Sequence, residues 1–141
     1  MLRASRDPES TRLLAELREG AAAKPDELYQ LLSWMNRNGL ALLVLDWLPG
    51  LPPEITAAPP VCIPVAEARA HGMEWEKLNE SLESGTWGAF DFMRLAYQAR
   101  AMDRMDDADG AKEAWAAAMA AAGGSAQRLE ELAKLALGWR W

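Results

Sequence analysis

The stretch LAYQARAMDRMDDADGAKEAWAAAMAAA, from Leu95 to Ala122, decides the fold of this 141-residue chain. Alanine, the residue with the highest helix propensity, makes up 12 of its 28 residues. The acidic run at its centre divides it, because aspartate disfavours a helix interior and caps the start of a helix instead. The stretch therefore predicts two helices, at about 87–104 and 107–122, joined by a turn short enough to make them antiparallel.

Small residues recur along both of these predicted helices. Ala99 lies at the centre of the first, and Ala111, Trp115 and Ala118 follow one another on the second. Small side chains let two helix axes approach closely, and an aromatic side chain can fill the groove toward a neighbouring pair. This arrangement resembles a tetratricopeptide repeat. The resemblance implies helix pairs that stack into a superhelix, with Trp115 buried between its own pair and the next.

A repeat of about 33 residues extends this unit along the chain. Gly39, Gly72, Met105 and Gly138 are spaced by this interval, and each is expected at the end of a helix. One helical hairpin cannot bury its apolar face alone, so repeats of this length indicate a solenoid. We therefore predict an all-α solenoid without a sheet, in which residues 1–141 form one repeat domain. Its ends fall in the middle of repeats, as in an excerpt of a longer array.

The earlier units match the tetratricopeptide pattern less closely. In the second unit Ala66 and Leu82 match, while Leu78 replaces an alanine, and in the first unit Pro49 stands where an aromatic is expected. HEAT-like repeats would give the same stack of helix pairs and remain an alternative. The residues predicted to pack the repeats together are Ala66, Leu78, Leu82, Ala99, Ala111, Trp115 and Ala118.

Apolar residues spaced by three and four positions predict the remaining helices. A proline-rich loop is expected at 49–60, followed by a helix that tolerates Pro64 only in its first turn. This proline-rich segment also looks like connections in degenerate helical-repeat domains of some bacterial transcription activators. The other expected helices lie at about 7–20, 25–38, 40–48, up to 71, 74–84 and 125–139.

Composition excludes several classes of partner and site. The net charge of −6 argues against a nucleic-acid surface and against binding to anionic membranes. Cys62 is the only cysteine, so no internal disulfide can form, and it is expected to be a small buried hydrophobe. No apolar run approaches the length of about 20 residues that crosses a bilayer. We expect a cytoplasmic protein if Met1 is the native start.

Candidate catalytic and metal-binding residues are few. His71 is the only histidine, and at a helix end it is expected to bond the last carbonyls. The run from Asp106 to Gly110 has part of the spacing of a calcium loop but fails at both ends, so it is expected to cap a helix. No phosphate-binding loop occurs. We therefore expect no catalysis, no metal and no cofactor.

Two functions remain open. The first is a scaffold that binds a protein or peptide in a concave groove, as the tetratricopeptide resemblance implies. The second is a helical accessory domain of a larger enzyme or bacterial regulator that packs in cis. Arg37, Arg100 and Arg104, with Trp34, are expected to bind the partner, since arginine offers a planar fork for carboxylates and tryptophan a rigid apolar surface. The alternative is that Arg100 and Arg104 only pair with nearby acids such as Asp103 or Asp107. The resemblance places on the groove wall Glu27, Gln30, Trp34, Arg37, Asn38, Ile63, Glu67, His71, Met93, Arg100, Asp103 and Arg104.

The C-terminal helix carries a further expectation. Leu132, Leu135, Leu137 and Trp139 are apolar residues close together near the end of the chain. An uncovered apolar patch of this kind favours self-association, because a two-fold contact needs only one patch. Folding of the terminal tryptophans back onto the last hairpin, or coverage by a partner chain, would hide the same patch.

Overall fold

The computed structural model describes residues 8–83 and 85–140, and throughout these residues the regular structure is helical, with no strand. The prediction of an all-α protein is confirmed. The chain divides into two compact units, Met1–Met73 and Glu74–Trp141, each with its own internal packing. Positions 7 and 84, the outer limits of two predicted helices, lie outside the described residues.

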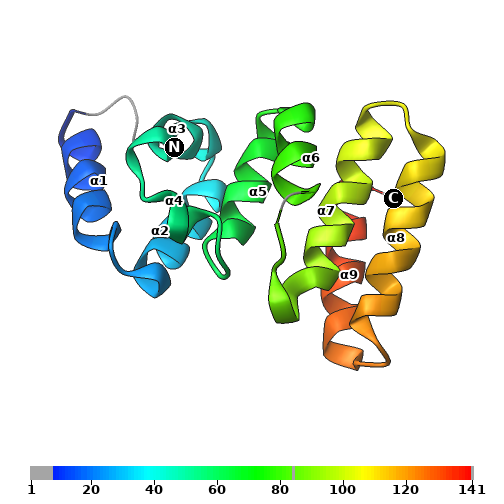
Figure 1. Cartoon of the computed structure of the whole chain (residues 1–141). Helices are drawn as coiled ribbons and strands as arrows, with labels where there is room; N and C mark the ends of the chain where they lie inside the picture. Colours follow the sequence, from blue (N-terminus) through cyan, green and yellow to red (C-terminus); the bar gives the residue numbers. More distant parts are fainter. Residues whose placement is uncertain (1–7, 84, 141) are drawn as a thin grey trace. The chain divides into compact units, whose positions relative to one another are not determined.

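The first unit is organised around α2. Its helices are α1 (Pro8–Ala21), α2 (Pro25–Arg37), α3 (Ala41–Trp47), α4 (Pro53–Thr56) and α5 (Cys62–His71), with a 3-10 turn η2 (Leu48–Gly50). Helix α2 packs against α1, α3 and α5, and α3 also packs against α5 (Figure 1). The core side chains include Leu28, Leu32, Met35, Val44 and Val61, none of which is exposed to solvent.

One buried polar contact ties α2 to α5. Asn36 is 6% exposed, and its amide nitrogen donates a hydrogen bond to the carbonyl of Pro64 over 2.9 Å. Pro64 is the third residue of α5, within the first turn as predicted. A buried amide that makes a hydrogen bond fixes the position of its partner helix more narrowly than apolar contact does.

The proline-rich segment at 49–60 is more ordered than a loop, and in this respect the prediction was wrong. The turn η2 overlaps its start and the four-residue helix α4 lies within it, with Pro49 and Pro53 in the first positions of the two turns. Proline fixes φ near the helical value. It has no backbone N–H, but an N–H in the first turn of a helix has no acceptor within the helix, so no hydrogen bond is lost there. Leu51 is buried and Ile55 packs against the core of the first unit, so tertiary contacts hold these short turns.

The second unit is organised around α7. Its elements are α6 (Trp75–Glu83), the 3-10 turn η3 (Gly88–Phe90), α7 (Asp91–Arg104), α8 (Ala108–Ala122) and α9 (Ala126–Trp139). Helix α7 packs against α6, α8 and α9. Figure 1 shows α7 and α8 side by side and running in opposite directions, as the short turn between them requires.

Two helix boundaries in this unit differ from the predicted ones. Helix α7 begins at Asp91 instead of 87, because Gly88 has a φ of +54°, which a right-handed helix does not use. At the other end, Gly138 lies within α9, and Arg140 takes the left-handed conformation that ends the helix. Three of the four positions spaced by 33 therefore follow a helix: Gly39, Gly72 and Met105.

Asp107 caps α8, which confirms its predicted role. Its carboxylate accepts a hydrogen bond from the backbone N–H of Gly110 over 2.9 Å. Asp106 before it has a φ of +64°, a conformation that aspartate tolerates better than most residues. These two residues reverse the chain between α7 and α8.

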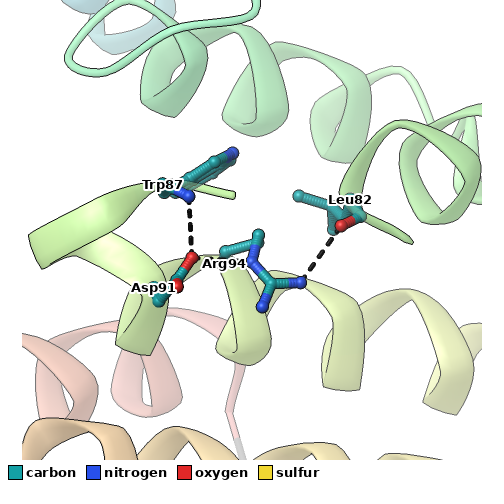
Figure 2. A network of polar contacts seen from close by, with 4 residues as sticks. All are labelled: Leu82, Trp87, Asp91 and Arg94. Carbon is teal, nitrogen blue, oxygen red and sulfur yellow. Dashed lines mark hydrogen bonds and ion pairs between the residues drawn. The ribbon is translucent and has the colours of Figure 1, made fainter. Parts of the chain in front are cut away.

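A polar network joins α6 to the start of α7 (Figure 2). Asp91 accepts hydrogen bonds from the backbone N–H of Trp87, at 2.7 Å, and from Nε of Arg94, at 2.8 Å. Arg94 also donates to the carbonyl of Leu82 in the last turn of α6, at 3.1 Å. The hydrogen bond from Arg94, with that from Trp87, holds the pKa of Asp91 below its usual range. The network bridges the chain reversal between the two helices.

Alanines fill the contact between α7 and α8. Ala96 on α7 and Ala118 and Ala122 on α8 are buried in one cluster with Phe92 and Leu132. Trp115 packs against this cluster but is only half-buried, so the prediction that it is buried was wrong. The buried residues of α8 are spaced by three and four, and position 115 lies at the edge of that stripe.

Replacing Ala118 by leucine should destabilise the protein by about 1–3 kcal/mol, because three extra carbons must enter a filled space between two helices. Ala118 has no exposed surface, whereas Ala117 on the same helix is exposed. Ala117→Leu therefore serves as the matched control and should change stability by less than about 0.5 kcal/mol. Chemical denaturation followed by circular dichroism measures both. Equal midpoints for the two variants would contradict this packing.

Candidate functional site

The predicted groove wall is divided between the two units. Glu27, Gln30, Trp34, Arg37, Asn38, Ile63, Glu67 and His71 belong to the first unit, and Met93, Arg100, Asp103 and Arg104 belong to the second. Ile63 is buried and so is not available on the wall, and Met93 is half-buried against the core cluster of the second unit. The remaining residues form three groups.

The first group lines an open groove of about 720 Å³ between α1 and α2. Trp34, which is 43% exposed, forms part of its wall, as do the predicted wall residues Glu27 and Gln30. Most of the lining is apolar, and Leu13 and Leu17 on α1 are 56% and 48% exposed. The complete lining is Leu13, Leu14, Glu16, Leu17, Gly20, Ala21, Lys24, Glu27, Gln30, Leu31 and Trp34.

Sequence reasoning missed the contribution of α1 to this groove. Leu13, Leu14 and Leu17 form one apolar stripe on α1, but only Leu14 is buried. At 100° per residue, Leu14 lies about 100° around the helix from Leu13 and about 60° from Leu17, so the three leucines span an arc of about 100°. A buried stripe on a helix is commonly this wide, so no pattern in the sequence indicates that Leu13 and Leu17 stay uncovered.

The second group surrounds Glu67. Its carboxylate lies 3.7 Å from Nε2 of His71, one turn later on α5, and the charge of Arg37 on α2 also acts on it. Partial burial raises the pKa of Glu67, and the charges of His71 and Arg37 oppose this effect. His71 was expected to bond the last carbonyls of its helix, and the contact found is with Glu67. Asn38 instead caps its own helix, donating to the carbonyl of Trp34 over 2.7 Å.

The third group lies in the second unit, where two arginines contact tryptophan rings. Arg100 Cζ lies 5.7 Å from the ring centroid of Trp75 on α6 and 5.6 Å from that of Trp139 on α9. Arg104 Cζ lies 6.0 Å from the same Trp75 ring. Cation–π contacts at these distances stabilise a guanidinium without neutralising its charge.

The expected alternative, in which these arginines pair with nearby acids, does not occur within residues 8–83 and 85–140. Among the described residues, no carboxylate oxygen lies within ion-pair distance of Arg100 or Arg104, although Asp103 and Asp107 are close in sequence. Burial lowers the pKa of Arg100, and the positive charge of Arg104 lowers it further. The charge of Asp103 partly offsets these effects.

The repeat-packing residues and the C-terminal helix can be placed as well. Ala66, Leu78, Leu82, Ala99, Ala111 and Ala118 are all buried, with Ala66 in the first unit and the others in the second. On α9, Leu132 is buried and Leu135 packs against the core. Trp139 folds onto its own unit, with its ring 5.4 Å from that of Tyr97, while Leu137 is 76% exposed. Self-association through α9 stays a prediction.

Groups with chemical reactivity are sparse. Among the described residues, no three histidine, cysteine, aspartate or glutamate side chains gather in a way that could hold a metal ion.

In the same part of the chain, no helix combines the length and hydropathy of a membrane span. Cys62 is a buried free thiol, as predicted, and burial raises its pKa to about 12.

Comparison with known proteins adds no relative: no protein-family model, no curated protein and no solved structure matches the chain. The groups described above are therefore interpreted from their own chemistry.

The thiol of Cys62 should resist modification in the folded protein. With a pKa near 12 instead of 9.0, its thiolate fraction at pH 8 falls by roughly a thousandfold, and the thiolate is the reactive form. Reaction with a chromogenic disulfide reagent at pH 8 should be slower by about this factor than in denaturant. The control is Ala58→Cys in a Cys62→Ser background, since position 58 is exposed and should react rapidly. Equal rates at the two positions would show that Cys62 is accessible.

Proposed function

We propose that this chain is a protein- or peptide-binding module built from tetratricopeptide-like helix pairs, without catalytic activity, and that the groove between α1 and α2 holds an apolar segment of the partner. The observation that carries the proposal is the combined exposure of Leu13, Leu17 and Trp34 in one groove. Tryptophan is the residue type most enriched at binding hot spots. Apolar side chains gathered in one groove are also more informative than single exposed ones.

The architecture supports a role in binding. The α7–α8 pair has the small-residue contact and the short turn by which tetratricopeptide-like hairpins pack. Three helices end at positions spaced by 33 residues. HEAT-like repeats would share both features, and such solenoids also present surfaces for partners.

The groove indicates the chemistry of its occupant. Its floor is apolar, while its polar lining residues include Glu16, Lys24 and Glu27. Lys24 and Glu27 form an exposed ion pair at 3.7 Å, so their charges cancel. Glu16 has no ion pair within the described part of the chain and leaves one negative charge at the rim. The groove therefore suits an amphipathic helix that presents two or three apolar side chains flanked by a basic residue.

Selection from a displayed library of amphipathic helical peptides tests this function on the full chain. We expect the enriched sequences to carry apolar residues at helical spacing with a flanking lysine or arginine. Leu17→Glu places a charge inside the groove and should weaken the binding of selected peptides at least tenfold, as measured by fluorescence anisotropy. Leu42 is also exposed, at 65%, and does not line the groove.

Leu42→Glu is therefore the matched control and should leave peptide affinity unchanged. Peptides that bind equally well to wild-type and Leu17→Glu protein would contradict the groove assignment. A library that yields no binders would favour the alternative function, in which the chain packs against another domain of the same protein.

A further inference from the structure

Two arginines in the second unit share one aromatic platform and have no counter-ion among residues 8–83 and 85–140. Arg100 contacts the rings of Trp75 and Trp139, and Arg104 contacts Trp75. The arginines are four residues apart on α7 and therefore lie on the same face. Their like charges repel, and the described residues supply no carboxylate at ion-pair distance from either.

The two other arginine–ring contacts in the described chain differ from this one. Arg18 lies over Trp47, with its Cζ 5.3 Å from the ring centroid, and Arg128 lies over Phe92 at 5.6 Å. Each is a single cation on a single ring, an arrangement that packing alone explains. Only at Trp75 do two guanidiniums contact the same ring. A chain with a net charge of −6 has many carboxylates, so a pair of arginines without one is unusual.

We propose that Arg100 and Arg104, held on Trp75 and Trp139, form a binding site for a carboxylate side chain of a protein partner. Guanidinium groups offer planar forks that match the two oxygens of a carboxylate. Contact with the indole rings restricts the movement of both guanidiniums before an anion binds, and a cation–π contact leaves their positive charge in place. Arg104 is exposed and Arg100 is half-buried, so an anion can reach the pair from solvent.

The local charge favours a carboxylate over a phosphate. Asp103 is the acid whose charge acts on Arg100, and Arg104 is the other cation that does so. These three side chains together carry a net charge of about +1, which one carboxylate balances. A phosphate group carries about −1.5 to −2 at pH 7 and would leave an excess of negative charge beside Asp103. The mutual repulsion that lowers the pKa of Arg100 would be relieved by either anion, but only the carboxylate leaves the site neutral.

This site rests on the proposed function in one respect, namely that a bound protein segment presents the carboxylate. Its test is independent of the α1–α2 groove. The full chain, labelled with ¹⁵N, is titrated at low ionic strength with the blocked pentapeptide acetyl-Ala-Ala-Glu-Ala-Ala-amide, and the arginine Nε–Hε signals are followed by NMR. We expect the signals of Arg100 and Arg104 to shift along one saturable curve while that of Arg18 stays constant.

Two further ligands and two variants complete the test. The glutamine analogue of the peptide should cause no saturable shift, and inorganic phosphate should bind more weakly than the glutamate peptide. Arg104→Gln should weaken peptide binding about tenfold, because one charge-assisted hydrogen-bonding group is lost. Arg18→Gln removes the same charge and an equivalent ring contact elsewhere, and it should leave the affinity unchanged.

Several outcomes would overturn the proposal: no saturable shift at Arg100 and Arg104, an equal shift with the glutamine peptide, or phosphate binding as tight as that of the glutamate peptide. The wild-type titration alone can give any of these results, so the test holds even if a variant fails to fold. Leu17→Glu should leave this titration unchanged. A library that yields no binders to the wild-type chain, together with an intact titration, would therefore reject the groove and retain the arginine site.

Discussion

The close contact between α7 and α8 is the constraint on which the second unit depends. Ala96 meets Ala118 and Ala122 in one buried cluster, and side chains of this size let two helix backbones approach more closely than leucine would allow. Because α7 also packs against α6 and α9, its position sets the positions of both. The polar network of Asp91 and Arg94 fixes the entry to α7, and the Asp107 cap fixes the entry to α8. The arginine–tryptophan platform is a consequence, since Trp75 and Trp139 reach Arg100 from the two helices that α7 holds.

The two units use their tryptophans in different ways. In the first unit Trp47 is buried in the core, while Trp34 stands in an open apolar groove. In the second unit Trp75 and Trp139 are partly covered and contact arginines, and Trp87 is buried near Tyr97 with the ring centroids 6.2 Å apart. An exposed indole in an apolar groove offers contact area, whereas an indole under a guanidinium orients a charge. The proposed binding function draws on both properties, the first for an apolar segment and the second for an acidic side chain.

Much of the helical order could be predicted from the sequence, because helix ends are decided locally. The helix starts follow residues with known preferences: Asp107 is the N-cap of α8, Pro25 is the first residue of α2, and Pro64 lies in the first turn of α5. The wrong boundaries have specific causes: Gly88 adopts a positive φ, and Gly138 is tolerated inside α9 while Arg140 ends it. The turns near Pro49 and Pro53 depend on core contacts of Leu51 and Ile55, which no local pattern reveals.

The candidate sites were less predictable than the helices, because a periodic pattern does not say which apolar residues remain uncovered. Trp34, Arg100 and Arg104 were expected on a groove wall. The exposure of Leu13 and Leu17, the burial of Ile63 and the packing of Met93 follow from neighbouring helices instead. Likewise, an ion pair from Arg100 to Asp103 is as compatible with the sequence as stacking on Trp75. Only the tertiary arrangement of α6, α7 and α9 distinguishes the two.

The central structural claim is that α7 and α8 form one cooperative unit through their alanine contact. Native-state hydrogen exchange of the full chain, read amide by amide, tests this claim most directly. We predict that the slowest amides of the second unit lie around Ala96 to Ala101 and Ala111 to Ala118, and that both sets exchange with the same opening free energy. Protection of α7 alone, with the amides of α8 exchanging as rapidly as those of an isolated helix, would contradict the account.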